Sequence, residues 1–226
     1  MPKPRPRKKT SSLKSRLSKT RLYLITDQEL SENQDTPKTV VAALKGGVDI
    51  VQLREYSLTD KKLLEMALEV RKLTRKYKAL FIVNNRPDIA LLSKADGVHL
   101  GQEDMTVSSA RQLLGKGKII GVSTHGMDQA KKAVKEGADY IGVGPVFPTQ
   151  TKKNVVPPVT LGYVKQIASS GITIPAFAIG GIKLHNVDEV LRAGARRIAV
   201  VTGIVGALNV EKIASEFKET LQRHPL

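Results

Sequence analysis

The chain has 226 residues, a length typical of one domain or of one compact barrel. Hydrophobic residues make up 41% of the chain and charged residues 26%, which excludes disorder throughout. The absence of cysteine excludes disulfides, thiol nucleophiles and thiolate metal sites, and is compatible with the reducing cytoplasm that we expect as its location. No long apolar run and no secretory signal is present, so we expect no membrane span, membrane partner or export.

The first 20 residues are predicted to be a basic extension, with the folded domain over residues 21–226. The formal net charge is +16, and residues 1–21 contain nine Lys or Arg and no acidic residue, so +7 remains on residues 22–226. A basic arm with Pro and Ser is typical of a solvated extension, while contact with RNA, contact with a membrane surface and a transit peptide stay open. The charge on the body indicates anionic ligands such as phosphates.

Short β-branched or apolar runs alternate with amphipathic stretches after this extension. The runs predict eight strands, at Leu22–Thr26, Ile50–Leu53, Leu80–Val83, Gly97–Leu100, Ile119–Val122, Tyr140–Val143, Ala176–Ile179 and Arg197–Val201. The clearest helices are expected at Asp60–Tyr77, Met127–Glu136 and Val210–Leu221. In the first of these helices, the side chains expected to face the sheet are Leu64, Ala67, Leu68 and Leu73.

A similar short sequence motif, called the repeated phrase below, precedes four of the predicted strands. It places a glycine and a small residue at the end of a helix, at Lys45–Ile50, Lys94–Val98, Glu136–Ile141 and Ala193–Ile198. Repeated units of this kind, with strands apolar on both faces, predict an α/β fold and specifically a (β/α)8 TIM barrel, a closed parallel barrel of eight strands. An open doubly wound sheet is the alternative, but no G-x-G-x-x-G follows the first strand.

Ligands of such barrels lie beyond the carboxyl ends of the strands, and the residues expected there are polar. They are Gln52, Arg54, Asn84, Asn85, Gln102, Glu103, Asp104, Ser123, Thr124, His125, Thr149, Thr151, Lys152, Gly180, Gly181, Thr202 and Gly203. The longest connection, Gly144–Thr160, is also polar, which is typical of a functional loop.

The chemistry of these side chains indicates positioning and electrostatics. Gly180-Gly181 and Thr202-Gly203, after the last two strands, together favour a phosphate cup over simple tight turns. Arg54 would bind an anion through parallel hydrogen bonds, and Lys152 is either a second cation or a solvated loop lysine. Asp104 is equally compatible with a magnesium ligand and with an N-cap of a helix near Thr106–Leu114. His125 is a proton carrier or, more commonly, a capping or surface residue.

Six segments in register resemble one known superfamily over about residues 21–222. They are Val51–Glu55, Val83–Ala90, Asp96–Asp104, Gly121–His125, Gly142–Lys152 and Ala178–Ile182. The superfamily contains thiamine phosphate synthases and thiazole tautomerases, and these segments resemble the synthases more closely. The resemblance implies a barrel transferase that joins hydroxymethylpyrimidine diphosphate to thiazole phosphate, with Mg2+ as cofactor and loss of diphosphate ahead of attack by the thiazole nitrogen.

The resemblance also implies roles for individual residues. Small phosphorylated molecules are the expected partners, a homodimer is left open, and nucleic-acid contact by the basic extension is disfavoured. Arg54, Ser123 and Lys152 are the expected catalytic residues, with Asp104 and Asn85 as metal ligands. The residues expected to contact the two substrates are Gln52, Arg54, Asn84, Ser123, Thr149, Thr151, Lys152, Gly181, Val201 and Thr202.

Two positions depart from the family pattern. The synthases usually have Lys where this chain has Tyr56, and Asp where it has Asn85, so one cation and one carboxylate at the leaving group are missing. Thiazole tautomerases use a histidine that aligns with His125, and tautomerase activity is therefore the main alternative, followed by a non-catalytic ligand-binding or RNA-binding protein. The complete Gly101–Asp104 and Thr149–Lys152 segments favour the synthase.

Overall fold

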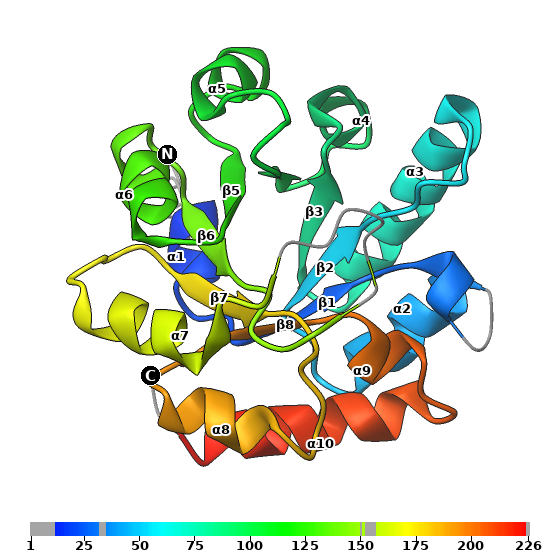
Figure 1. The fold of residues 1–226 in the computed structure, drawn as a ribbon. Coiled ribbons are helices and arrows are strands. Elements are labelled where there is room, and N and C mark those ends of the chain that lie inside the picture. The colour runs from blue at the N-terminus through cyan, green and yellow to red at the C-terminus, as the bar shows by residue number, and fades with distance from the viewer. Residues whose placement is uncertain (1–11, 32–34, 150, 152–156, 225–226) are drawn as a thin grey trace, which may run out of the picture.

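The strands form a closed parallel barrel that is surrounded by helices (Figure 1). A computed structural model describes residues 12–31, 35–149, 151 and 157–224. In these residues eight strands pair in chain order, and β8 pairs with β1 to close the barrel. The strands are β1 Leu22–Ile25, β2 Ile50–Leu53, β3 Leu80–Asn84, β4 Gly97–Leu100, β5 Ile119–Thr124, β6 Tyr140–Val143, β7 Ala176–Ile179 and β8 Ile198–Val200. The predicted TIM barrel is confirmed, and each predicted strand end lies within two residues of its observed position.

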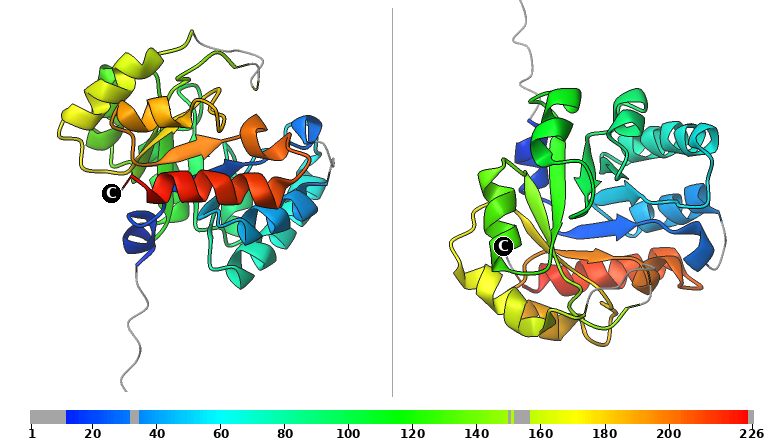
Figure 2. Two further views of the ribbon diagram at one scale, coloured as in Figure 1. Left: turned by 90° about the horizontal axis from the view of Figure 1, so that it is seen from below. Right: turned by 45° about the horizontal axis from the view of Figure 1, so that its top comes forward.

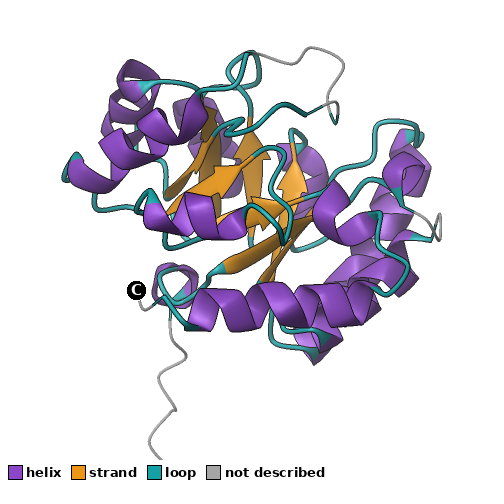
Figure 3. Ribbon diagram, turned by 60° about the horizontal axis from the view of Figure 1, so that its bottom comes forward, coloured by secondary structure: helices purple, strands orange, loops and turns teal. Residues whose placement is uncertain are grey.

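Helices connect successive strands and pack outside the barrel (Figure 3). The helices after the first strand are η1 Gln28–Leu30, α2 Thr36–Lys45, α3 Asp60–Lys76, α4 Pro87–Leu92, α5 Val107–Leu114, α6 Met127–Lys135, α7 Thr160–Ser169, α8 Val187–Arg192, α9 Thr202–Val205 and α10 Val210–Gln222. No helix in the described ranges is long and apolar enough to cross a bilayer.

The buried face of α3 differs from the predicted one. Leu63, Ala67, Val70 and Thr74 are buried, whereas Leu68 is 43% exposed. Leu64 and Leu73 only flank this face and are partly buried. The buried residues follow a spacing of four, three and four, which keeps them on one side of a helix of 3.6 residues per turn. The prediction of Ala67 is confirmed. Leu63, Val70 and Thr74 complete the buried face in place of the three predicted leucines.

Aromatic rings fill the barrel interior. Tyr23, Tyr140 and Phe177 contact one another edge to face, with ring centroids 5.3–5.9 Å apart. Gly121 is paired with Tyr140 in the register of β5 and β6, and a Cβ at Gly121 would overlap the Tyr140 ring. The glycine therefore provides the space that a large side chain needs in an interior packed at crystalline density.

Aspartates in the repeated phrases tie neighbouring strands together at their amino ends. Asp49 accepts the backbone N–H of Leu22 at 3.0 Å, Asp96 that of Phe81 at 2.9 Å, and Asp139 that of Ile120 at 2.9 Å. A cation neutralises each carboxylate, namely Lys218, Arg71 and Arg111 in the same order. The repeated phrase thus does more than end a helix. Its aspartate joins the strand that follows the phrase to the preceding strand of the barrel.

The folded structure begins before residue 21, which corrects the predicted solvated extension for residues 12–20. Helix α1, Leu13–Leu17, lies at the amino ends of the strands (Figure 2), and Leu17 is 1% exposed within the core. Arg16 donates to the Lys78 carbonyl at 3.0 Å, and Lys14 pairs with Asp139 at 2.7 Å. The basic residues of this segment therefore cover the end of the barrel where the strands begin. Residues 1–11 lie outside the described residues.

We predict that Leu17→Ala lowers the free energy of unfolding by about 2–5 kcal/mol, because it leaves a cavity under the barrel. Leu208→Ala is the matched control, since Leu208 is 93% exposed and should change stability by less than about 0.5 kcal/mol. Urea unfolding of both variants measures the difference. Equal stability of the two variants would show that α1 does not belong to the folded unit.

Candidate functional site

Arg54 is a buried cation at the carboxyl end of β2. It is 3% exposed, and its Nη2 donates to Asp27 Oδ2 at 2.5 Å. Its Nε is buried and has no hydrogen-bond partner among the described residues. Because a buried charged group is costly unless its donors are satisfied, this guanidinium retains capacity for a further anion.

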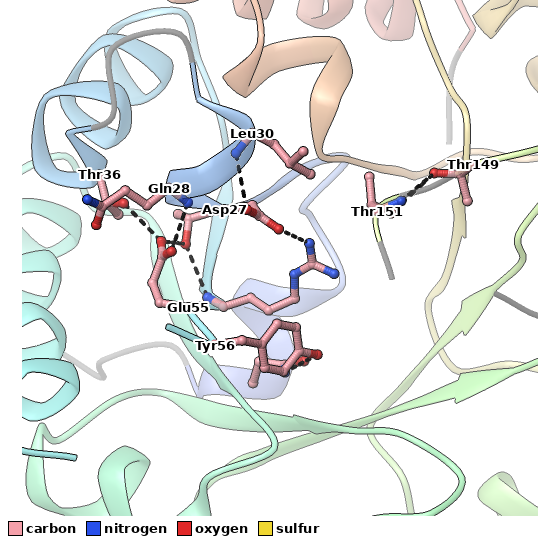
Figure 4. Close-up of polar contacts among 11 residues, drawn as sticks. Asp27, Gln28, Leu30, Thr36, Glu55, Tyr56, Thr149 and Thr151 are labelled. Carbon is pink, nitrogen blue, oxygen red and sulfur yellow. Dashed lines mark hydrogen bonds and ion pairs between the residues drawn. The ribbon is translucent and has the colours of Figure 1, made fainter. Parts of the chain in front are cut away.

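A buried carboxylate, Glu55, holds the segment after β1 against the end of β2 (Figure 4). Its Oε1 accepts the hydroxyls of Thr26 at 2.7 Å and Thr36 at 2.9 Å, and its Oε2 accepts the backbone N–H of Gln28 at 2.8 Å. Burial raises the pKa of Glu55 above its ordinary value, and the three hydrogen bonds oppose this shift. Glu55 thereby fixes the segment that carries Asp27.

Tyr56 stands over the Arg54 guanidinium. The distance from Arg54 Cζ to the Tyr56 ring centroid is 5.5 Å, which is within the range of a cation–π contact. The Tyr56 hydroxyl also accepts a long hydrogen bond of 3.4 Å from Asn84 Nδ2. Tyr56 is 65% exposed, so the outer face of its ring remains in solvent. In this chain position 56 supplies a contact to Arg54 rather than a charge.

The proposed metal ligands follow neighbouring strands, β3 and β4. Asn85 has a left-handed backbone, with φ 56°, and its N–H donates to the His99 carbonyl at 2.8 Å. Asp104 Oδ2 accepts the Gly101 N–H at 2.5 Å and so closes the turn after β4. The alternative role of Asp104 as a helix N-cap is wrong, because Thr106 caps α5 by accepting the Ser109 N–H at 3.2 Å.

One carboxylate and one amide do not by themselves enclose a metal. The described residues contain no group of three or more His, Asp or Glu side chains that could hold an ion. Mg2+, however, commonly keeps several waters and binds one or two carboxylates together with substrate phosphates. Among the described residues, Asp104 makes its hydrogen bond through Oδ2 alone, so this donor set fits a magnesium ion that arrives largely ligated by substrate and water.

Ser123 is connected to the barrel interior by hydrogen bonds. Its Oγ lies 2.9 Å from His99 Nε2, and His99 Nδ1 lies 2.9 Å from the Tyr140 hydroxyl. The Tyr140 and Tyr23 hydroxyls are 2.8 Å apart, and Gln52 Nε2 donates to the Tyr23 hydroxyl at 2.7 Å. Gln52 and Ser123, both predicted as substrate contacts, are therefore the two ends of one buried network.

His125 is held at the end of β5 by two hydrogen bonds. Its backbone N–H donates to Gln129 Oε1 at 2.7 Å, and its Nδ1 lies 2.5 Å from the Gly144 carbonyl oxygen. A carbonyl only accepts, so Nδ1 carries a proton and Nε2 of the neutral ring is the basic nitrogen. The ring is thus oriented by the chain rather than free on the surface.

The glycine turn after β7 packs against the loop after β6. Gly180 and Gly181 have φ values of 103° and 64°, and a Cβ at Gly181 would lie 2.7 Å from the Pro148 carbonyl oxygen. Phe147 N–H donates to the Gly180 carbonyl at 3.1 Å. This contact brings the loop that carries Thr149 and Thr151 to the glycine turn.

The remaining predicted phosphate contacts come from two segments, the loop after β6 and the residues after β8. The Thr149 hydroxyl accepts the Thr151 backbone N–H at 3.4 Å (Figure 4), and the two hydroxyls are 3.2 Å apart, so the two threonines lie side by side. Val201 is the residue between β8 and α9, and Thr202 begins α9. Lys152 lies outside the described residues, and its predicted role stays a sequence-based expectation.

The sequence prediction did not identify Asp27, Glu55 or His99 as parts of the site. Asp27 and Glu55 sit next to residues that were chosen, but an isolated acidic residue after a strand gives no sign of its partner. His99 was visible as a polar residue inside an otherwise apolar strand, Gly97–Leu100. A buried polar side chain requires a hydrogen-bond partner, so this position was the available signal.

Comparison with known proteins gives a consistent result. Residues 22–204 match the family described as thiamine monophosphate synthase. A thiamine-phosphate synthase of Halalkalibacterium halodurans is 47% identical over 90% of this chain and 96% of its own length, and one of Shouchella clausii is 50% identical over 87% and 93%. A solved structure of thiamine phosphate pyrophosphorylase from Pyrococcus furiosus is 37% identical, with a TM-score of 0.83, and the match covers 94% of this chain and 98% of that chain.

We predict that Glu55 makes stability fall as pH rises. Its raised pKa means that the folded state binds more protons than the unfolded state between the two pKa values, so the ionised carboxylate costs stability above that window. Relative to Glu55→Gln, the wild-type chain should therefore lose stability as pH rises from about 4 to about 7.

Urea unfolding of both proteins across this pH range measures the difference. Glu29→Gln, which changes an exposed carboxylate on the same segment, is the control and should show a smaller change with pH. A difference that instead grows in favour of wild type with rising pH would contradict the sign of the pKa shift.

Proposed function

The chain belongs to the thiamine monophosphate synthase family, and we propose that it joins hydroxymethylpyrimidine diphosphate to thiazole phosphate, giving thiamine phosphate and diphosphate. This activity is that of a transferase that uses small phosphorylated substrates. The observation that carries the proposal is the buried Arg54, whose guanidinium has one donor engaged by Asp27 and whose Nε has no hydrogen-bond partner in the part of the chain that the structure describes. Such a group is suited to an anion with several oxygens, and a diphosphate is one.

The two substrates would occupy opposite parts of the mouth. The diphosphate end would be formed by Arg54 after β2 and by Asn84 at the end of β3, joined by Lys152 as predicted from the sequence. The thiazole phosphate end is formed by the glycine turn at Gly181, by Thr149 and Thr151, and by the backbone at Val201 and Thr202. Glycine allows close approach of phosphate oxygens to backbone N–H groups, which supports this assignment.

The reaction needs stabilisation of a leaving group more than it needs a nucleophile on the protein. The bond from the pyrimidine methylene carbon to the diphosphate oxygen breaks, and the electron pair leaves with the diphosphate. The thiazole nitrogen then forms the new bond to that carbon. Arg54 would stabilise the negative charge that develops on the leaving oxygen, and the residues at the mouth would hold the thiazole close to the cation. Ser123 would lie near the reacting carbon.

Asp104 and Asn85 are the residues that would hold magnesium together with the diphosphate. A bound magnesium ion would neutralise charge on the diphosphate and so make it a better leaving group. Asn85 offers an amide oxygen in place of a second carboxylate. Its left-handed backbone is a conformation that Asn and Asp both tolerate, so an Asp at this position requires no new backbone geometry.

Thiazole tautomerase activity is the second candidate, and the orientation of His125 favours it. The Gly144 carbonyl leaves Nε2 of the neutral ring unprotonated, as a general base requires. The synthase is the better supported activity, because a tautomerase has no use for a buried arginine that binds diphosphate or for Asp104. The curated relatives named above also carry the synthase name.

We predict that purified protein releases diphosphate and forms thiamine phosphate from the two substrates with Mg2+, and that EDTA abolishes the reaction. Arg54→Lys and Asp104→Asn should each lower kcat/KM at least about tenfold, because each removes a contact to developing charge. His125→Asn should lower kcat/KM less than about threefold, since His125 contacts neither the diphosphate nor the magnesium ion in this proposal. A protein that forms no thiamine phosphate but moves protons on thiazole phosphate in a His125-dependent way would instead be a tautomerase.

Tyr56→Lys combined with Asn85→Asp should raise kcat at least about tenfold if the native site is a weakened synthase, because both changes return a charge to the leaving group. Single-turnover measurement of diphosphate release separates this effect from product release. Tyr56→Phe is the control, because it retains the ring over Arg54 and adds no charge. An unchanged rate in the double variant would contradict the prediction that the native site is weakened at the leaving group.

A further inference from the structure

We infer that His99 is a positioning residue, which fixes the Ser123 hydroxyl as a hydrogen-bond donor toward the substrate. It does so through a directional chain that begins at Gln52 and passes through Tyr23 and Tyr140. The inference deepens the proposed function and rests on it, since it is there that Ser123 is placed near the reacting carbon. His99 itself need not touch either substrate.

This chain of hydrogen bonds crosses the barrel interior and contains one residue from each of five strands. Gln52 comes from β2, Tyr23 from β1, Tyr140 from β6, His99 from β4 and Ser123 from β5. Each successive polar pair is 2.7–2.9 Å apart, which is within ordinary hydrogen-bond range. All members except Ser123 are buried, and Ser123 is half-buried at the mouth.

Counting hydrogens gives the chain a direction. The Gln52 amide nitrogen can only donate, so the Tyr23 oxygen accepts and the Tyr23 hydrogen is available for Tyr140. Tyr140 in turn donates to His99 Nδ1, and the neutral imidazole then carries its proton on Nε2. Nε2–H donates to Ser123 Oγ, which leaves the single serine hydrogen for a lone-pair-bearing atom of the substrate.

The opposite direction is disfavoured by the position of the Gln52 nitrogen. If Ser123 donated to His99, the two phenols would donate in sequence toward Gln52, and the Tyr23 hydrogen would meet an amide N–H. A buried donor without an acceptor costs about 1–3 kcal/mol, so this arrangement would require the Gln52 amide to turn over. The orientation of one amide therefore decides whether Ser123 donates or accepts.

The surrounding packing fixes the chain without making it a path for charge. Burial raises the pKa of both Tyr23 and Tyr140, so the two phenols keep their protons. The His99 ring stacks on Tyr140 with centroids 5.5 Å apart, and Gly121 leaves room for the Tyr140 ring. The hydrogen-bond chain consequently moves no charge. It determines which atom of each pair is the donor.

Replacing His99 by asparagine or by glutamine distinguishes the roles of the two imidazole nitrogens. An asparagine amide reaches the position of Nδ1 and retains the contact to Tyr140, whereas a glutamine amide reaches the position of Nε2 and can still donate to Ser123. We expect His99→Asn to lower kcat at least tenfold with KM changed less than threefold, and His99→Gln to stay within about threefold of wild type. Equal losses in the two variants, or no loss in either, would overturn the inference.

A double-variant cycle tests whether His99 acts through Ser123. Ser123→Ala removes the group that His99 orients, so adding His99→Asn to it should cause no further loss of kcat. A further loss of the full factor seen in the single His99 variant would overturn the inference. Tyr163→Phe is the matched control, because it removes a buried hydroxyl that bonds to Thr124 and Gly126 outside the chain, and it should change kcat less than twofold. Thermal unfolding of every variant identifies losses caused by misfolding.

A measurement without turnover distinguishes failure of this inference from failure of the proposed function. Nitrogen-15 NMR of the labelled wild-type protein at pH 7.5 reports the protonated nitrogen of each histidine, and the His99 signals are those absent from His99→Asn. We expect a neutral His99 with the proton on Nε2. A proton on Nδ1 would overturn the directional chain, whatever the activity. If His99 has its proton on Nε2 but the protein forms no thiamine phosphate, that result would contradict the proposed function and leave the inference about His99 intact.

Discussion

Closure of the sheet by the pairing of β1 with β8 is the constraint on which the site depends. Once the sheet is closed and parallel, every strand must end at the same mouth, and residues far apart in the chain come together there. The opposite end of the barrel is free for stabilising contacts. Asp49, Asp96 and Asp139 tie neighbouring strands there, and α1 covers that end. The chain thus separates the groups that stabilise the barrel from those that would bind substrate.

The electrostatics of the mouth depend on one buried cation and the groups that hold it. Asp27 balances the charge of Arg54, Glu55 holds the segment that carries Asp27, and the Tyr56 ring lies against the guanidinium. Removing any of these supports would let a long side chain lose its orientation. An arginine that is already desolvated and oriented loses little conformational freedom when an anion binds, which favours strong charge stabilisation.

The strands were predictable because they are runs of β-branched and apolar residues bounded by glycine-containing joints, and a chain of such units has few ways to bury both strand faces. Residues after the strands were predictable as site candidates for the same reason. The sequence could not reveal pairings between distant residues, such as Asp27 with Arg54 or His99 with Ser123. It also concealed α1, because a single buried leucine within a basic, polar segment gives no periodic signal. The cap at Thr106 rather than Asp104 depends on where one helix begins, which is the least certain feature of a sequence pattern.

The pairing of Gly121 with Tyr140 has a consequence for how such chains diverge. Because a Cβ at position 121 would overlap the Tyr140 ring, the two positions cannot vary independently. A relative with a side chain at the first position must have a smaller residue at the second, and would then lack the phenol that links the two halves of the interior. The buried hydrogen-bond network through Tyr140 therefore depends on the absence of a side chain at position 121.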